Sequence, residues 1–216
     1  MSWTLGLDIG QSQDPTAVAA VEHAGALRKG DPAEYHLRHV ARFELGTPYP
    51  QVVEEVAALM GSAELTKTKA RPPGTENRVI SPSLVVDATG VGRPIVEMLE
   101  EEGLDPISIW ITGGDSVTQD DTEFRVPKRE LASTVQALLQ SGRLKFARDL
   151  PLRDVLTDEL QKFRAKISIE TGEASFEHWR ERDTDDVVLA LACALWHAER
   201  GGNQRRAFNS ILELNS

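Results

Sequence analysis

Two short apolar segments, far apart in the chain, each end in an aspartate. Residues 4–10 read TLGLDIG, and their strand-like alternation places Asp8 on the face opposite to the large apolar side chains. Residues 84–87 read LVVD, an unbroken apolar run of the kind expected in a central strand that is covered on both faces. The sequence therefore predicts two neighbouring central strands that deliver Asp8 and Asp87 to one place.

A third group of acids opens an almost wholly apolar helix. The segment RDTDDVVLALACALW, residues 182–196, predicts a helix that begins near residue 184 and continues to about residue 199. Mg²⁺ and Mn²⁺ prefer oxygen ligands, and phosphodiester cleavage by two ions needs several carboxylates around ions about 4 Å apart. We predict that two divalent ions, Mg²⁺ or Mn²⁺, are held by Asp8, Asp87, Asp185 and Asp186.

Each acid also has a structural explanation when it is taken alone. Asp8 and Asp87 suit turns at strand ends, where an aspartate side chain often accepts a hydrogen bond from the backbone N–H two residues later. Asp183, Asp185 and Asp186 suit the start of a helix. There the helix dipole favours negative charge, and each acid stabilises the helix by about 0.3–1 kcal/mol. The metal hypothesis therefore depends on one topology that brings the three places together.

Length and composition indicate one compact α/β domain. The 216 residues are 40% hydrophobic and 27% charged, which suits a single core. We expect the domain to cover residues 1–200 and residues 201–216 to form a flexible tail. Neither a membrane-spanning run nor a signal-peptide pattern is present, so we expect a cytoplasmic protein. The single cysteine, Cys193, lies in the apolar helix and is expected to be a buried hydrophobe.

The predicted elements follow the order of the ribonuclease H-like fold. Three strands joined by short connections, residues 4–10, 16–22 and 34–45, suggest an antiparallel meander. One helix then precedes the strand at 84–87, and another leads to a strand at 107–111, which should run parallel to it. The predicted class is α/β with a mixed five-stranded sheet, three antiparallel strands and then two parallel ones, flanked by helices.

Three further segments lie outside this core. Residues 62–82 and 113–126 carry loop signatures, the first with several cations and the second acidic with glycine. Residues 166–178, KISIETGEASFEH, alternate on both sides of a Thr-Gly pair, so they predict an extra β-hairpin.

The formal net charge of −10 bears on nucleic-acid binding. A protein that depends on phosphate contacts usually carries a basic face, so the sum alone disfavours nucleic acid. Metal-binding carboxylates contribute negative charge that bound cations cancel locally, which weakens that objection. The grouped cations include Lys128, Arg129 and Lys166, and each group suits a solvated surface equally well.

The chain resembles the nuclease domain of phage large terminase subunits, which cut concatemeric DNA. The resemblance rests on GLDIGQSQDPTAVAAVE and LVVDATGVGRPIVEML, followed in order by ITGGDS, VPKRELASTVQALLQSGRLKF, LTDELQKF and DTDDVVLALACALW. It implies that Asp8, Asp87 and Asp185 are metal ligands, with Asp186 as a helper. Asp14 falls where the family often has an acid before its second strand. It also implies that double-stranded DNA lies along Lys128, Arg129 and the 166–178 hairpin, where Lys166 is a candidate contact.

Two departures from the family pattern affect what the resemblance implies. The sequence contains no G-x-x-x-x-G-K-[ST] phosphate loop, so we expect no DNA translocation without a separate terminase ATPase. A small terminase subunit and a portal are the further partners that the resemblance implies. The family often has histidine before the paired acids of the last helix, whereas this chain has Thr184.

Three alternatives remain open from the sequence. A RuvC-like junction resolvase, or another ribonuclease H-like nuclease, has a similar arrangement of carboxylates. In the actin and sugar-kinase superfamily, the Asp8-Ile9-Gly10 turn and the glycines after Asp87 would bind the phosphates of ATP, but two such domains normally enclose the nucleotide. A non-catalytic interaction domain would retain the acids for folding.

Overall fold

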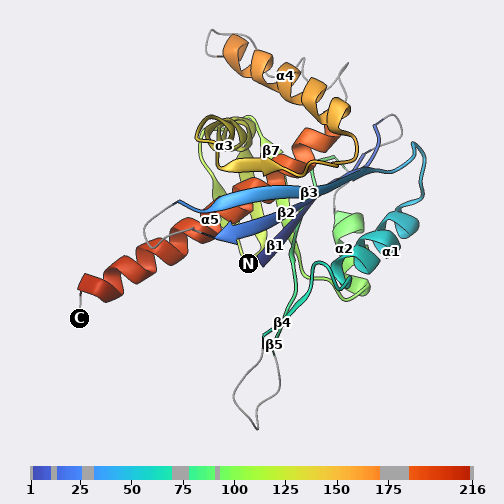
Figure 1. The fold of residues 1–216 in the computed structure, drawn as a ribbon. Helices are drawn as coiled ribbons and strands as arrows, with labels where there is room; N and C mark the ends of the chain where they lie inside the picture. Colours follow the sequence, from blue (N-terminus) through green and yellow to red (C-terminus); the bar gives the residue numbers. More distant parts are fainter. Residues whose placement is uncertain are drawn as a thin grey trace.

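The computed structural model describes residues 2–10, 14–25, 32–69, 78–90, 93–170 and 185–214. These residues form an eight-stranded mixed sheet with helices on both faces, and a separate two-stranded ribbon (Figure 1). The strand order of the large sheet is β10-β3-β2-β1-β6-β7-β9-β8.

The centre of the sheet has the predicted arrangement. Strand β1 (Ser2–Asp8) pairs antiparallel with β2 (Ala17–Gly25), which pairs antiparallel with β3 (Glu34–Arg42). On its other side β1 pairs parallel with β6 (Ser83–Asp87), and β6 pairs parallel with β7 (Pro106–Thr112). The α/β class and the ribonuclease H-like order of strands are therefore confirmed.

The sheet is wider than the five strands predicted. Strand β9 (Glu123–Pro127) pairs parallel with β7, and β8 (Thr118–Asp120) pairs antiparallel with β9. At the opposite edge β10 (Leu144–Phe146) pairs parallel with β3. Strands β8 and β10 have three residues each, and β8 is exposed throughout, so they lack the apolar alternation by which a strand is recognised. Strand β9 does alternate, with Phe124 and Val126 buried, but it has only five residues. The prediction of a loop over residues 113–126 was therefore wrong.

The predicted loop over residues 62–82 also contains secondary structure. Strands β4 (Lys67–Lys69) and β5 (Arg78–Ile80) pair antiparallel as a ribbon beside the main sheet (Figure 1). Residues 70–77, which connect them, lie outside the described residues.

The predicted hairpin at residues 166–178 is wrong over its first arm. Helix α4 (Arg153–Glu170) includes that arm, and residues 171–178 lie outside the described residues. Five alternating residues are too few to separate a strand from the last turn of a helix by periodicity.

The last helix is longer than predicted. Helix α5 (Asp186–Leu214) continues past the expected end near residue 199, through most of the segment predicted as a tail. Glycine costs only about 1 kcal/mol in a helix interior, so the Gly201-Gly202 pair was a weak signal for a helix end. No helix within the described ranges combines the length and apolarity needed to cross a membrane.

Different helices cover the two faces of the sheet. Helix α1 (Tyr49–Met60) and helix α2 (Arg93–Glu101) cover one face and pack on Leu5 and Leu7 of β1. Helix α3 (Lys128–Gln140), α4 and α5 cover the other (Figure 1). All residues from 187 to 196 of α5 are buried, which explains why this helix is apolar on every side.

Helix α5 approaches β1 closely at Gly6. A Cβ atom on Gly6 would lie 1.8 Å from the carbonyl oxygen of Ala190 and 3.1 Å from the Cβ of Ala194. Asp8 follows Gly6 on the same face of the strand. The missing side chain therefore lets the start of α5 lie beside Asp8.

We predict that Gly6→Ala destabilises the fold strongly. The added methyl group meets backbone of α5, so the helix must shift away from β1, and we expect the free energy of unfolding to fall by about 3 kcal/mol or more. Chemical denaturation followed by circular dichroism measures this. Gly113→Ala is the control, because nothing lies within 4 Å of a Cβ atom there, and we expect a change within about 0.5 kcal/mol. Equal stability of the two variants would contradict the close approach.

Candidate metal centre

Asp8 and Asp87 are direct partners on two adjacent parallel strands. Asp8 of β1 pairs with Asp87 of β6 at the end of the shared register. Neighbouring strands lie about 4.8 Å apart, and paired residues share a face of the sheet. Asp87 is buried and Asp8 is partly buried. The predicted convergence of these two carboxylates is present.

The chain turns tightly after Asp87. One carboxylate oxygen of Asp87 accepts a hydrogen bond from the N–H of Thr89 at 2.8 Å. The Thr89 hydroxyl in turn accepts one from the N–H of Ile111 at 2.7 Å, which ties the turn to β7. Gly90 has a φ of +91°, a conformation that favours glycine. The turn holds one carboxylate oxygen of Asp87 in place.

Helix α5 brings the third pair of acids to the same place. The carbonyl of Asp185 accepts the N–H of Leu189 at 2.8 Å, so Asp185 occupies the N-cap position. Burial raises the pKa of Asp8 well above its usual value, and the charges of Asp87, Asp185 and Asp186 raise it further. The four acids therefore form one electrostatic cluster.

Two further acids were considered from the sequence. Asp14 is exposed, and its charge contributes to the raised pKa of Asp186, so it lies near the cluster. Asp183 lies outside the described residues.

The three cations predicted to contact DNA lie in different surroundings. The ammonium of Lys128 is 4.0 Å from a carboxylate oxygen of Asp185, and its side chain is only 16% exposed. Arg129, the next residue, is 52% exposed and pairs with Asp115 at 2.6 Å. Lys166 lies in α4, and its side chain is outside the described part of the structure. Lys128 therefore belongs to the acid cluster and Arg129 to the surface.

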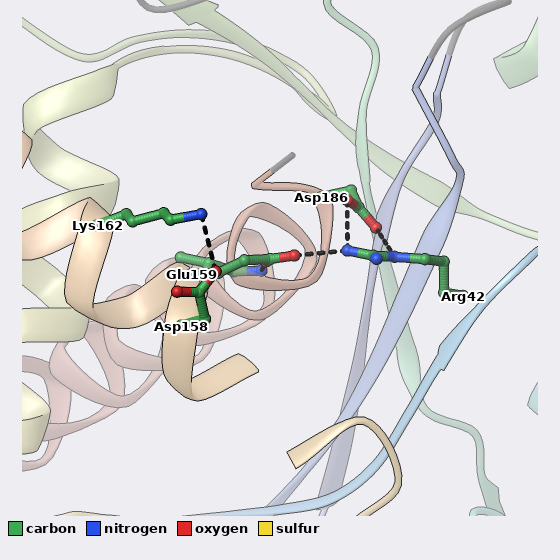
Figure 2. A network of polar contacts seen from close by, with 6 residues as sticks. Arg42, Asp158, Glu159, Lys162 and Asp186 are labelled. Atoms are coloured by element: carbon green, nitrogen blue, oxygen red, sulfur yellow. Dashed lines mark hydrogen bonds and ion pairs between the residues drawn. The ribbon is translucent and has the colours of Figure 1, made fainter. Parts of the chain in front are cut away.

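Arg42, which the sequence analysis missed, binds Asp186 with two nitrogens. Its Nε donates to one carboxylate oxygen at 2.7 Å and its Nη2 to the other at 2.8 Å (Figure 2). Burial raises the pKa of Asp186 despite the opposing effect of this guanidinium. Arg42 lies two residues after buried Val40, so a cation on the core face of a strand was the available signal.

Glu159 of α4 completes this contact and was also missed. It accepts a hydrogen bond from Arg42 Nη2 at 2.5 Å and another from the N–H of Val188 at 2.9 Å. Burial raises the pKa of Glu159 to about 7, although both partners lower it. Its sequence position gave a signal, because Glu159 lies at helical spacing between Leu156 and Phe163 on the apolar stripe.

The donor chemistry of the cluster fits a hard cation. Carboxylate oxygens on two adjacent strands and at one helix start are the ligands that Mg²⁺ and Mn²⁺ prefer. Within the part of the chain that the structure describes, no three His, Cys, Asp or Glu side chains are already arranged to hold a metal ion. Arg42 binds Asp186 and Lys128 lies beside Asp185, so two cations already balance part of the negative charge.

Cys193 takes no part in this chemistry. It is fully buried in α5, and burial raises the pKa of its thiol well above the usual value. A neutral buried thiol is not a nucleophile, so the prediction of a small buried hydrophobe is confirmed.

The chain was compared with known families and solved structures. No protein-family model matches it, and no curated protein matches it significantly. The large terminase nuclease from thermophilic phage G20c matches with a TM-score of 0.53 and 18% identity, over 89% of this chain and 80% of that chain. This chain has the fold of that nuclease.

Weaker likenesses to two other solved structures were found. The human cytomegalovirus terminase nuclease domain, soaked with Mn and with inhibitor bound, has a TM-score of 0.48 and 15% identity, over 88% of this chain and 80% of that chain. The g2p large terminase nuclease domain of bacteriophage SPP1 with bound Mn has a TM-score of 0.46 and 13% identity, over 90% and 85%.

We predict that Asp8→Asn stabilises the protein in the absence of divalent ions. The substitution removes a buried charge that its acidic neighbours repel, so the free energy of unfolding in EDTA at neutral pH should rise by about 1 kcal/mol. Urea denaturation measures it. Asp158→Asn is the control, because Asp158 is 61% exposed and pairs only with Lys162 on the helix surface among the contacts described, and it should change stability by less than about 0.5 kcal/mol. A destabilised Asp8→Asn would show that the acids do not repel one another.

Proposed function

We propose that the protein is a metal-dependent DNA endonuclease of the large terminase type. Asp8, Asp87 and Asp185 hold Mg²⁺ or Mn²⁺, as two ions, and water is the nucleophile that attacks the phosphodiester. The observation that carries the proposal is the direct pairing of Asp8 with Asp87 at the ends of the two central strands. The nuclease fold shared with the phage G20c protein supports it.

The residues of the chain have separate parts in this mechanism. The three carboxylates share a region whose negative charge already raises the pKa of Asp8, and this repulsion favours uptake of cations. A bound divalent ion supplies an activated water and stabilises the departing 3′ oxygen. The Thr89 N–H holds one oxygen of Asp87, which keeps this carboxylate in one orientation. No lysine or histidine is needed as a general base.

We propose different DNA contacts for Lys128 and Arg129. Lys128 is mostly enclosed next to Asp185, and this position supports a contact of its ammonium with the phosphate that is cleaved. Arg129 is exposed on the first turn of α3 and suits a phosphate farther along the double-stranded DNA. Lys166 stays a candidate contact from the sequence alone. We propose that cleavage has little sequence preference.

The proposed setting is genome packaging in a phage or prophage, in the host cytoplasm. A packaging ATPase, a small terminase subunit and a portal are the partners implied by the resemblance. The kinase-like alternative gains no support from the site, because it gives no part to Asp185 and Asp186, whose charges act on Asp8. A RuvC-like substrate would use the same carboxylates, so four-way junctions belong among the DNA substrates tested.

We predict that Asp87→Asn abolishes cleavage. Wild-type protein should nick plasmid DNA with Mn²⁺ or Mg²⁺ and lose this activity in EDTA, whereas Asp87→Asn should be at least about 1,000-fold slower because one ligand charge is gone. Agarose gels follow the reaction, and circular dichroism checks the fold. Asp158→Asn should cleave at the wild-type rate. Undiminished cleavage by Asp87→Asn would point to a contaminating nuclease.

We predict that Lys128→Gln and Arg129→Gln separate cleavage from binding. Loss of the enclosed ammonium should slow the cleavage step about 100-fold with saturating DNA. Loss of the exposed guanidinium should weaken DNA binding only a few-fold and leave the rate at saturation unchanged. Single-turnover kinetics and fluorescence anisotropy measure the two effects. Similar rates for both variants would contradict the place assigned to Lys128.

A further inference from the structure

The two adjacent acids at the start of α5 face different cations. Asp185 has Lys128 beside it, at 4.0 Å, whereas both oxygens of Asp186 accept hydrogen bonds from Arg42. Asp186 is only 3% exposed. Asp185 is the N-cap residue and Asp186 is the first residue of the helix, and the two carboxylates have different partners.

Arg42 belongs to a row of paired residues across the sheet. Arg42 of β3 pairs with Ala17 of β2, Ala17 pairs with Asp8, and Asp8 pairs with Asp87. Paired residues share a face, so the guanidinium stands on the same face as the two acids. The intervening Ala17 is fully buried and small, which leaves room for the first turn of α5 above the row.

Glu159 supplies an acceptor that the start of α5 requires. The N–H of Val188 is at the third helical position, where the N-cap side chain usually accepts. Here the acceptor comes from α4, because Glu159 binds this N–H with one oxygen and Arg42 with the other. Glu159 is 2% exposed. The three side chains thus join β3, α4 and α5 (Figure 2).

We propose that Asp186 is a positioning residue, and that Arg42 and Glu159 act through it to aim Asp185 at the metal ions. This inference rests on the proposed function and refines its ligand set. To ligate an ion, Asp186 would have to use oxygens that already accept two charge-assisted hydrogen bonds from Arg42. The added cation would also lie next to the positive guanidinium, which is unfavourable. Residues that hold a metal ligand in place typically change metal affinity by about 10-fold to 100-fold when they are removed.

The test is a double-mutant cycle on Mn²⁺ binding, measured by isothermal titration calorimetry without DNA. Asp186→Asn and Arg42→Gln should each weaken Mn²⁺ binding about 10-fold without lowering the number of ions bound. The double variant should bind Mn²⁺ with the same affinity as the single variant that binds it less tightly. The two losses should not add, because each substitution breaks the same contact. Asp185→Asn should instead lower the number of ions bound.

Two further variants complete the design. Asp158→Asn neutralises the neighbouring acid on α4, which pairs with Lys162 at 2.8 Å outside the three-residue contact (Figure 2), and it should bind Mn²⁺ as the wild type does. Arg42→Lys keeps the charge but loses the two-nitrogen geometry. Its affinity for Mn²⁺ should lie between those of the wild type and Arg42→Gln. If Arg42→Gln does not fold, Arg42→Lys takes its place in the cycle.

Different failures have different meanings. Fewer ions bound to Asp186→Asn, or a loss that persists in full when Arg42 is already replaced, would overturn the positioning role and make Asp186 a ligand. That result would leave the nuclease proposal intact. A wild-type protein that binds no Mn²⁺ would overturn both, because no metal site would then exist for Asp185 to serve.

Discussion

The close packing of α5 on β1 is the constraint on which the candidate site depends. Gly6 provides no side chain at the contact, so the backbone of the helix can lie directly against the strand. Asp8 is two residues beyond Gly6, and the first turn of α5 carries Asp185 and Asp186. The absence of a side chain at Gly6 therefore lets the helix pack closely on the strand. This packing brings Asp185 and Asp186 near Asp8, although their charges repel one another.

This packing creates an electrostatic problem that the neighbouring elements partly solve. Burial and the nearby acids raise the pKa of Asp8, which means that the folded chain resists holding all the charges at once. Arg42 comes from the strand two places along the sheet, and Lys128 comes from the start of α3. Each cation faces one acid of α5, and the proposed divalent ions would balance the charges of Asp8 and Asp87.

The sequence allowed prediction of those parts of the fold whose signal is local. Apolar strands ending in Asp8 and Asp87, and the apolar start of α5, follow from periodicity within a few residues. Edge strands β8 and β10 are only three residues long, too short for such a signal, and they pair with strands at the margins of the sheet. The helical first arm of the predicted hairpin and the length of α5 were also missed, since short alternating or glycine-containing segments are compatible with both structures.

For the candidate site too, the sequence allowed prediction only of what has a local signal. Acids at strand and helix ends could be proposed as a set from their order in the chain, but their different roles could not. Arg42 and Asp186 are 144 residues apart, and Arg42 and Glu159 are 117 apart, so no local pattern joins them. Asp185 and Asp186 look equivalent in the sequence. Only the partners in the folded chain distinguish them, because Lys128 lies beside Asp185 and Arg42 binds Asp186.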